Sequence, residues 1–191
     1  RTYGEPGSAP VFTEVKRKFG HVVNKSRATI PFDQWSEDVV TCPEVNPLLE
    51  KAEHVESFLE FKRLVRESAC VPQVLVRYTR ESYRGKYDHY ARVTFDRRLE
   101  YQPARGWSDF GGGGRWRPMD SALVQGMEYP FSASVLELKT LNDAPNWMLE
   151  VVRQFDLTRT GNCKYSSAVW MDMIGEQTDG MHPFAVALGD A

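Results

Sequence analysis

The segment at residues 134–140, with the sequence SVLELKT, changes between apolar and charged side chains at every second position. In an extended chain, Glu137 and Lys139 lie on one side of the strand, whereas Leu136 and Leu138 lie on the other. A period of two residues is typical of a strand with one apolar and one charged face. The pattern recurs earlier in the chain, so it constrains the possible folds more than any other feature.

Earlier alternating runs are expected to form strands at residues 11–19, 21–30, 73–83 and 91–102. Gly20 is expected to turn the first two runs into a hairpin, and residues 85–90 are expected to do so for the next two. In the last run, one side of the strand is expected to carry Arg92, Thr94, Asp96 and Arg98. Most strands are therefore predicted to follow one another as antiparallel hairpins.

The remaining segments are interpreted as helices and loops. Helices are expected at residues 54–69 and, after Pro145, at 146–157. A short helix is expected within the loop at 31–47, a plain loop at 107–120, and a short helix or strand at 162–173. Aromatic side chains expected in the core are Trp147, Phe155 and Trp170. This order predicts an α+β protein, built on an antiparallel β-barrel or tunnel with helices packed outside.

Composition restricts the function that such a fold can have. The chain has 191 residues, of which 41% are hydrophobic, and this is material for one globular domain. Its 24 basic and 26 acidic residues give a net charge of −2, so a general nucleic-acid binder is not indicated. Any affinity for anions must come from the local placement of basic side chains.

Cysteine and histidine positions indicate neither disulfides nor a metal site. Cys42, Cys70 and Cys163 are widely spaced and form no CxxC pair, and the histidines have no metal-ligand spacing. A cytoplasmic location is expected. There is no apolar run of about 18 residues, so no membrane segment is expected. The opening residues RTYGEPGSAP read as the end of a strand and a turn, and further chain is expected upstream of Arg1.

Basic residues fall on the charged faces of the predicted strands. The candidates are Lys16, Lys18, Lys25, Arg27, Arg80, Arg92 and Lys139, with Lys164 from a later segment. If helices cover the apolar faces, these cations would line a barrel interior, and their mutual repulsion would favour a polyanion there. Glu137 would then hold a divalent cation shared with phosphate oxygens. The alternative is that the strands are half-exposed and the charges are simply solvated.

Two further motifs favour a structural interpretation. The run Gly111–Gly114 lacks the GK[ST] ending of a phosphate-binding loop and does not lie between a strand and a helix. It is interpreted as a flexible loop. Cys163 has no recognisable histidine partner, so it is interpreted as a structural thiol rather than a nucleophile.

An ordered set of motifs resembles a known family. The motifs are RTYG, VFTEVKRKF, NKSRATI, VLVRYTRESY, ARVTFDRRL, VLELKT and CKYSSAV, and they run from Arg1 to Val169. Together they resemble the bacterial form of the VTC (vacuolar transporter chaperone) polyphosphate polymerase domain. That domain belongs to the triphosphate tunnel metalloenzymes, or CYTH-like group. The resemblance implies a basic antiparallel β-tunnel that transfers the γ-phosphate of ATP to polyphosphate, with Mn²⁺ or Mg²⁺.

The resemblance also implies roles for individual residues. Catalytic roles are implied for Lys16, Arg80, Arg92, Lys139 and Lys164. Substrate-binding roles are implied for these five and also for Arg1, Lys25 and Arg27, and Glu137 is implied as the metal ligand. The family's first strand, the helix after it and one arginine would lie upstream of Arg1. Cys163 stands where the family motif has serine.

The implied partners are ATP and polyphosphate or another triphosphate anion. Phosphoryl transfer by positioning and electrostatics requires no protein nucleophile. A metal-dependent triphosphatase of the same fold and a non-catalytic polyphosphate-binding module remain as alternatives. The domain is expected to span residues 1–175, followed by a tail at 176–191.

Overall fold

The computed structural model describes residues 1–20, 22–87, 90–119, 134–141, 143–159 and 163–178. Two compact units are present, and each is described by itself. The first unit comprises Arg1–Gln73 with Ala104–Gly112, and the second comprises Val74–Pro103 with Gly113–Ala191. Both combine helices with antiparallel strands, so the α+β class is confirmed. Within the described ranges neither sheet closes into a barrel.

The first unit is built on the predicted hairpin of β1 (Val11–Phe19) and β2 (Val22–Ile30). Gly20 allows the tight turn, because its φ of 59° lies in the left-handed region that glycine adopts without strain. Glu14 lies opposite Arg27 in the register of the hairpin, so these two side chains share one face. The charged face that the sequence predicts is therefore present on this hairpin.

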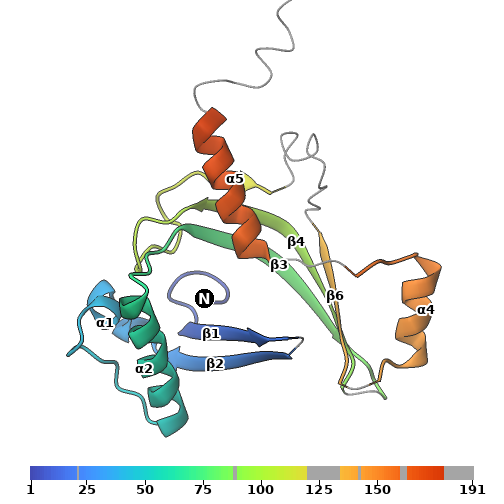
Figure 1. Cartoon of the computed structure of the whole chain (residues 1–191), viewed down its shortest axis with the longest axis horizontal. Coiled ribbons are helices and arrows are strands. Elements are labelled where there is room, and N and C mark those ends of the chain that lie inside the picture. The colour runs from blue at the N-terminus through green and yellow to red at the C-terminus, as the bar shows by residue number, and fades with distance from the viewer. Residues whose placement is uncertain (21, 88–89, 120–133, 142, 160–162, 179–191) are drawn as a thin grey trace, which may run out of the picture. The chain divides into compact units, whose positions relative to one another are not determined.

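Helices cover the other face of the hairpin (Figure 1). Three helical segments follow β2: η1 (Phe32–Gln34), α1 (Glu37–Thr41) and α2 (Ala52–Glu67). Ser36 caps α1 by accepting a hydrogen bond from the Val39 amide at 3.3 Å. The buried core of this unit consists of Ala28, Ile30, Val39 and Phe58. In the first unit, then, the apolar face packs against helices and the charged face points away from them, as predicted.

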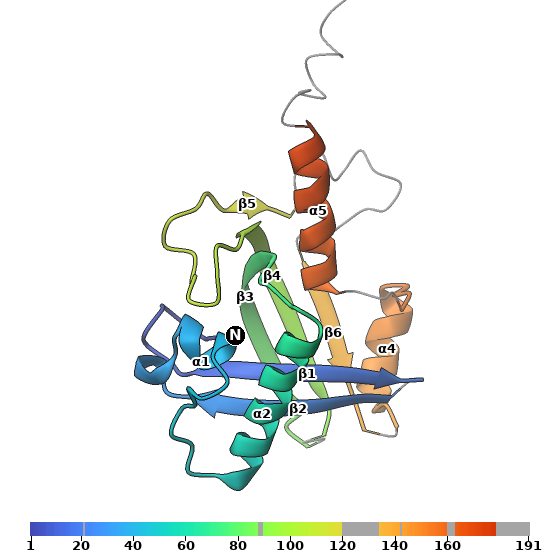
Figure 2. The ribbon, with the colours of Figure 1, turned by 60° about the vertical axis from the view of Figure 1, so that its left-hand side comes forward.

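The second unit contains a sheet centred on β4 (Arg92–Pro103). It pairs along one edge with β3 (Val74–Arg84), as the predicted hairpin. It also pairs with the short β5 (Arg117–Pro118) and with β6 (Val135–Lys139), and all pairings are antiparallel. Figure 2 shows β3, β4 and β6 side by side. The expectation of a plain loop at 107–120 is wrong at β5, which adds two residues to the edge of β4.

A β-bulge interrupts β4 and changes which residues share a face. The register shifts between Arg77 and Thr79 on β3, and Arg98 on β4 has a φ of 54°. The extra residue places Leu99, rather than Arg98, on the same face as Asp96. The predicted grouping of Arg98 with Asp96 is therefore wrong, because strict alternation stops at the bulge.

Helix α5 (Lys164–Thr178) packs on the apolar end of this face. The core of the second unit consists of Val74, Leu99, Tyr101, Met119, Ala168 and Met171. Because β3 and β4 carry charged side chains further along the same face, the helix and the charges lie on one side of the sheet. The sequence predicts helices outside a charged tunnel, whereas α5 packs on the face that carries the charges in this unit. Segment 162–173, left open between helix and strand, is helical from Lys164.

Helix α4 (Asn146–Gln154) begins after Pro145 as predicted, but it contributes little to the core. Met148 is its buried residue. Trp147, Phe155 and, on α5, Trp170 are 38%, 65% and 41% exposed, so the expectation that they are core residues is wrong. Among the helices that the structure describes, none has the length and apolar content needed to cross a membrane. The domain boundary at 175 and the cytoplasmic location stay predictions.

Candidate functional site

Asp96 is the centre of the charged face in the second unit. Its side chain is 0% exposed, and its Oδ1 and Oδ2 accept hydrogen bonds from Arg80 Nε and Nη2 at 2.6 and 2.7 Å. Lys164 Nζ lies 2.8 Å from the same Oδ2. The two predicted cations Arg80, from β3, and Lys164, from the start of α5, thus converge on one buried carboxylate.

The protonation of this cluster is fixed by its contacts. Burial by itself would raise the pKa of Asp96, but the hydrogen bonds from Arg80 and Lys164 outweigh it and hold the pKa below its usual value. The hydrogen bond to Asp96 in turn raises the pKa of Arg80. Asp96 is therefore ionised and Arg80 is protonated at neutral pH, so the arrangement is a paired network rather than a source of protons.

Glu137 lies on the same face, one strand further along. Its Oε1 is 2.9 Å from Lys139 Nζ, and its Oε2 accepts a hydrogen bond from Thr94 Oγ1 at 3.3 Å and lies 3.8 Å from Arg80 Nη2. Burial favours a higher pKa, but the contacts with Lys139 and Arg80 lower the pKa of Glu137 overall. The side chain is 36% exposed, so an ionised carboxylate remains accessible from solvent.

A basic pocket lies at the far end of this face. It encloses about 250 Å³ and is lined by Arg84, Tyr90, Arg92, Lys139, Thr140 and Leu141. In the sheet register Arg92 lies opposite Arg84 on β3 and opposite Lys139 on β6, so three cations form a row across three strands. Arg92 Nε is buried and has no hydrogen-bond partner among the described residues. This end of the face carries positive charge that the described part of the chain does not neutralise.

The first unit has its own charged cluster around Glu14. Its Oε1 accepts hydrogen bonds from Arg27 Nε at 2.8 Å and Nη2 at 2.5 Å, and Lys25 Nζ lies 3.2 Å away. Arg1 Nε lies 3.6 Å from Oε2. Burial acts to raise the pKa of Glu14, but the hydrogen bonds from Arg27 and Lys25 prevail and lower it to about 2. The remaining predicted cation, Lys16, is exposed and makes no ion pair to a described residue.

The position of Arg1 follows from backbone pairing. Its nitrogen donates to the Phe12 carbonyl at 2.6 Å, and the Phe12 amide donates back to the Arg1 carbonyl at 2.7 Å. This exchange resembles one pair of an antiparallel ladder, and it brings the Arg1 side chain to Glu14. The side chain of Lys18 lies outside the described residues.

The predicted site residues therefore form two groups, one on each unit. Arg1, Lys16, Lys25 and Arg27 belong to the first, and Arg80, Arg92, Glu137, Lys139 and Lys164 to the second. Within each unit the predicted residues share one face. The prediction that all of them line a single concave surface stays a prediction.

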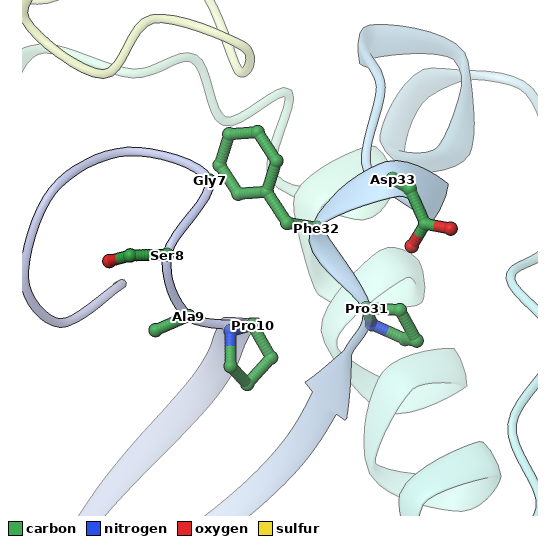
Figure 3. Close-up of a pocket in the computed structure, with 7 residues that line it drawn as sticks. All are labelled: Gly7, Ser8, Ala9, Pro10, Pro31, Phe32 and Asp33. Atoms are coloured by element: carbon green, nitrogen blue, oxygen red, sulfur yellow. The ribbon is translucent and has the colours of Figure 1, made fainter.

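A second cavity, of about 400 Å³, lies in the first unit away from these cations. Figure 3 shows it between the chain at Gly7–Pro10 and the segment Pro31–Asp33. Its lining is small or apolar apart from Ser8 and Asp33, so it offers no cation to an anionic ligand. It is not a candidate for the site.

Sequence reasoning missed three residues of the second site. Asp96 and Thr94 were placed on the correct face, but nothing in the alternation shows that Asp96 is buried under two cations. Arg84 was missed because the strand was expected to end at residue 83, whereas β3 continues to Arg84. The sequence did contain a signal for Arg84, because it lies four residues after Arg80 and therefore on the same face of an extended strand.

The donor set can be tested for a divalent metal. Among the described residues there is no group of three or more acidic, histidine or cysteine side chains that could hold an ion alone. Mg²⁺, however, is usually held by one or two carboxylates together with substrate phosphates. Glu137, partly exposed and ionised beside a basic pocket, fits that shared type of coordination.

These features define a class of α+β protein whose antiparallel sheets carry faces rich in Arg and Lys. The family model for the VTC domain matches residues 1–171, and the chain therefore belongs to the VTC domain family. This family is associated with polyphosphate metabolism. Searches of curated proteins and of solved structures gave no match.

Proposed function

We propose that the protein is a phosphotransferase of the polyphosphate polymerase type, which moves the γ-phosphate of ATP to the end of a polyphosphate chain. One observation carries the proposal. In a VTC-family chain, Arg80, Arg92, Lys139 and Lys164 lie on the same face as the ionised Glu137. Such a face provides several cations for a long anion and one carboxylate for a cation.

In the proposed reaction, a terminal phosphate oxygen of the acceptor chain attacks the γ-phosphorus of ATP in line. The bond between the γ-phosphorus and the bridging oxygen breaks, and ADP leaves. Arg92 and Lys139 bind phosphate oxygens and oppose the charge that develops on them. Arg80 and Lys164 are partly committed to Asp96, so they hold the sheet and helix in position and contribute their outer N–H groups to the anion.

Glu137 would hold Mg²⁺ or Mn²⁺, which would supply charge neutralisation on the phosphate oxygens. The proposal includes the basic tunnel that the resemblance to the triphosphate tunnel metalloenzymes implies. Lys16, Lys25, Arg27 and Arg1 would then bind more distant phosphates. What supports this extension is the VTC family membership and the charged face of the first unit.

The test is product analysis after incubation with ATP and Mn²⁺ or Mg²⁺, with and without a short polyphosphate primer. Growth of the primer with release of ADP supports the proposal. Free phosphate in place of chain growth would indicate a triphosphatase, and binding without turnover would indicate a binding module. Either result would contradict the proposed transfer.

Variants sharpen the assay. Arg92→Ala and Lys139→Ala should each lower the rate of chain growth about 100-fold, a loss typical of one electrostatic contact in a transfer site. Arg97→Ala is the matched control, because Arg97 lies on the same strand but faces the opposite side, where it pairs with Glu81 at 3.2 Å.

Glu137→Gln should abolish metal-dependent turnover with little change in fold. Full turnover in the Glu137 variant would exclude it as the ligand.

A further inference from the structure

The row of cations across the end of the second sheet includes one that the family motifs do not contain. Arg84, at the last position of β3, is the direct neighbour of Arg92 on β4. Like charges directly opposite each other on neighbouring strands are destabilising. Neither arginine makes an ion pair to a described residue, and both line the 250 Å³ pocket together with Lys139.

The two ends of this charged face differ in how their cations are neutralised. At one end Arg80 and Lys164 hold the fully buried Asp96 at hydrogen-bond distance. At the other end Lys139 contacts the partly exposed Glu137, while Arg84 and Arg92 have no carboxylate partner among the described residues. Among the residues that the structure describes, the positive charge of the face is therefore concentrated at the pocket, which an external anion can enter.

We propose that Arg84 is a further anion-binding residue, and that the pocket of Arg84, Arg92 and Lys139 holds a phosphate group of the condensed phosphate chain. The inference rests on the proposed function for the identity of the anion. Neighbouring strands lie about 4.8 Å apart, so the row presents donors from three strands to one phosphate. Guanidinium groups suit this purpose because each can donate two parallel hydrogen bonds to phosphate oxygens.

The pocket also contains Tyr90, which is 43% exposed, and this suggests a competing occupant. An aromatic ring beside two arginines could receive a nucleotide base by stacking. The absence of an acidic partner for Arg84 and Arg92 within the described chain favours the phosphate, because a neutral base would leave their charges unpaired. The experiment separates the two occupants by comparing ATP with inorganic triphosphate.

The experiment measures binding by calorimetry at two salt concentrations. The ligands are monophosphate, triphosphate, a longer linear polyphosphate and ATP. Arg84→Ala should weaken binding of triphosphate and polyphosphate about tenfold, corresponding to one lost charged contact. The affinity of Arg84→Ala for these anions should also depend less on salt concentration, because one fewer charged contact is screened. Arg84→Lys should recover part of the affinity, and Arg97→Ala should bind like the parent protein.

Thermal unfolding provides the structural control. Arg84→Ala should be as stable as the parent or slightly more stable, because it removes repulsion from Arg92. Triphosphate affinity unchanged in Arg84→Ala would overturn the inference. A loss of affinity for ATP but not for triphosphate would also overturn the inference, because it would assign the pocket to the nucleotide base.

The inference and the proposed function can fail separately. If the parent protein extends the chain but Arg84→Ala binds anions as the parent does, the phosphotransferase proposal stands and the role of the pocket is contradicted. Weakened binding by Arg84→Ala without any phosphoryl transfer would retain the pocket and reject the enzyme. A parent protein that binds no condensed phosphate would reject both.

Discussion

The two units separate apolar from charged side chains in different ways. In the first unit the separation runs through the thickness of the hairpin, with Ile30 and its apolar neighbours on one face and Glu14 and Arg27 on the other. In the second unit it runs along one face of the sheet, where Tyr101 packs against α5 and Asp96 lies further along the strand. The difference has a chemical result: the carboxylate of the second unit is completely buried, whereas that of the first keeps part of its surface in water.

The largest loss of stability is expected when the buried carboxylate of the second unit is removed. Asp96→Asn should lower the free energy of unfolding by about 3 kcal/mol, because it leaves Arg80 and Lys164 facing a neutral group in a buried position. Urea denaturation measures this. A loss below about 1 kcal/mol would show that the two cations rehydrate freely, and that the buried network is no more important than an exposed pair.

A glycine contact should give the next largest effect. A Cβ on Gly114 would clash with Oε1 of Gln102, whose side chain is 1% exposed and has little room to move. Gly114→Ala should therefore cost about 2 kcal/mol of stability through overpacking. Gly112→Ala is the matched control, because nothing lies within 4 Å of its Cβ position. Equal stabilities of the two variants would contradict the close packing of this loop on β4.

Acid titration should report on the first unit. The pKa of Glu14 is about 2 in the folded protein, against a usual value of 4.5. Because the folded pKa is depressed, its stabilisation is present above pH 4.5 and is lost as the pH falls from 4.5 towards 2. Glu14→Gln should cost about 1.5 kcal/mol at neutral pH, the low end of the range for hydrogen bonds to a charged group. It should also flatten the pH dependence of unfolding in that window.

Chemical denaturation of the parent and the Glu14 variant between pH 2 and 7 measures both effects. Parallel stability profiles for the two proteins would contradict an ionised Glu14 held by Arg27.

The smallest effect is expected at the rim of the same cluster. Lys25 is 44% exposed and lies 3.2 Å from Glu14, so Lys25→Ala should change stability by less than about 0.5 kcal/mol. Its effect on polyphosphate affinity should be larger than its effect on folding if the proposed function is right. A variant that loses stability but keeps its affinity for anions would make Lys25 a structural residue instead.

The sequence predicts the strands of both units well, because their side chains alternate over many positions. Both hairpins and the helices at α2 and α4 form where the pattern places them, within a few residues. What the pattern could not reveal is the bulge at Arg98. No glycine marks that position, and an arginine in the left-handed region has no signature in composition. Strict alternation therefore predicts Arg98 on the face of Asp96, where the structure places Leu99 instead.

The site was predictable in kind but not in detail. The cations follow from strand phase and from the order of the family motifs. Whether a given cation is committed to an internal partner depends on depth in the fold, which alternation does not encode. Arg80 and Arg92 have the same appearance in the sequence, yet one lies against buried Asp96 and the other has no ion pair in the described chain.

The bulge in β4 shifts the alternation of side chains by one residue. The side chains before Arg98 and those after it alternate in opposite phases, so that Asp96 and Leu99 lie on the same face of the sheet. If Arg98 instead adopted regular extended backbone, strict alternation would turn Leu99 and Tyr101 away from α5. The left-handed backbone of this one residue thus decides whether the charged half and the apolar half of β4 share a face.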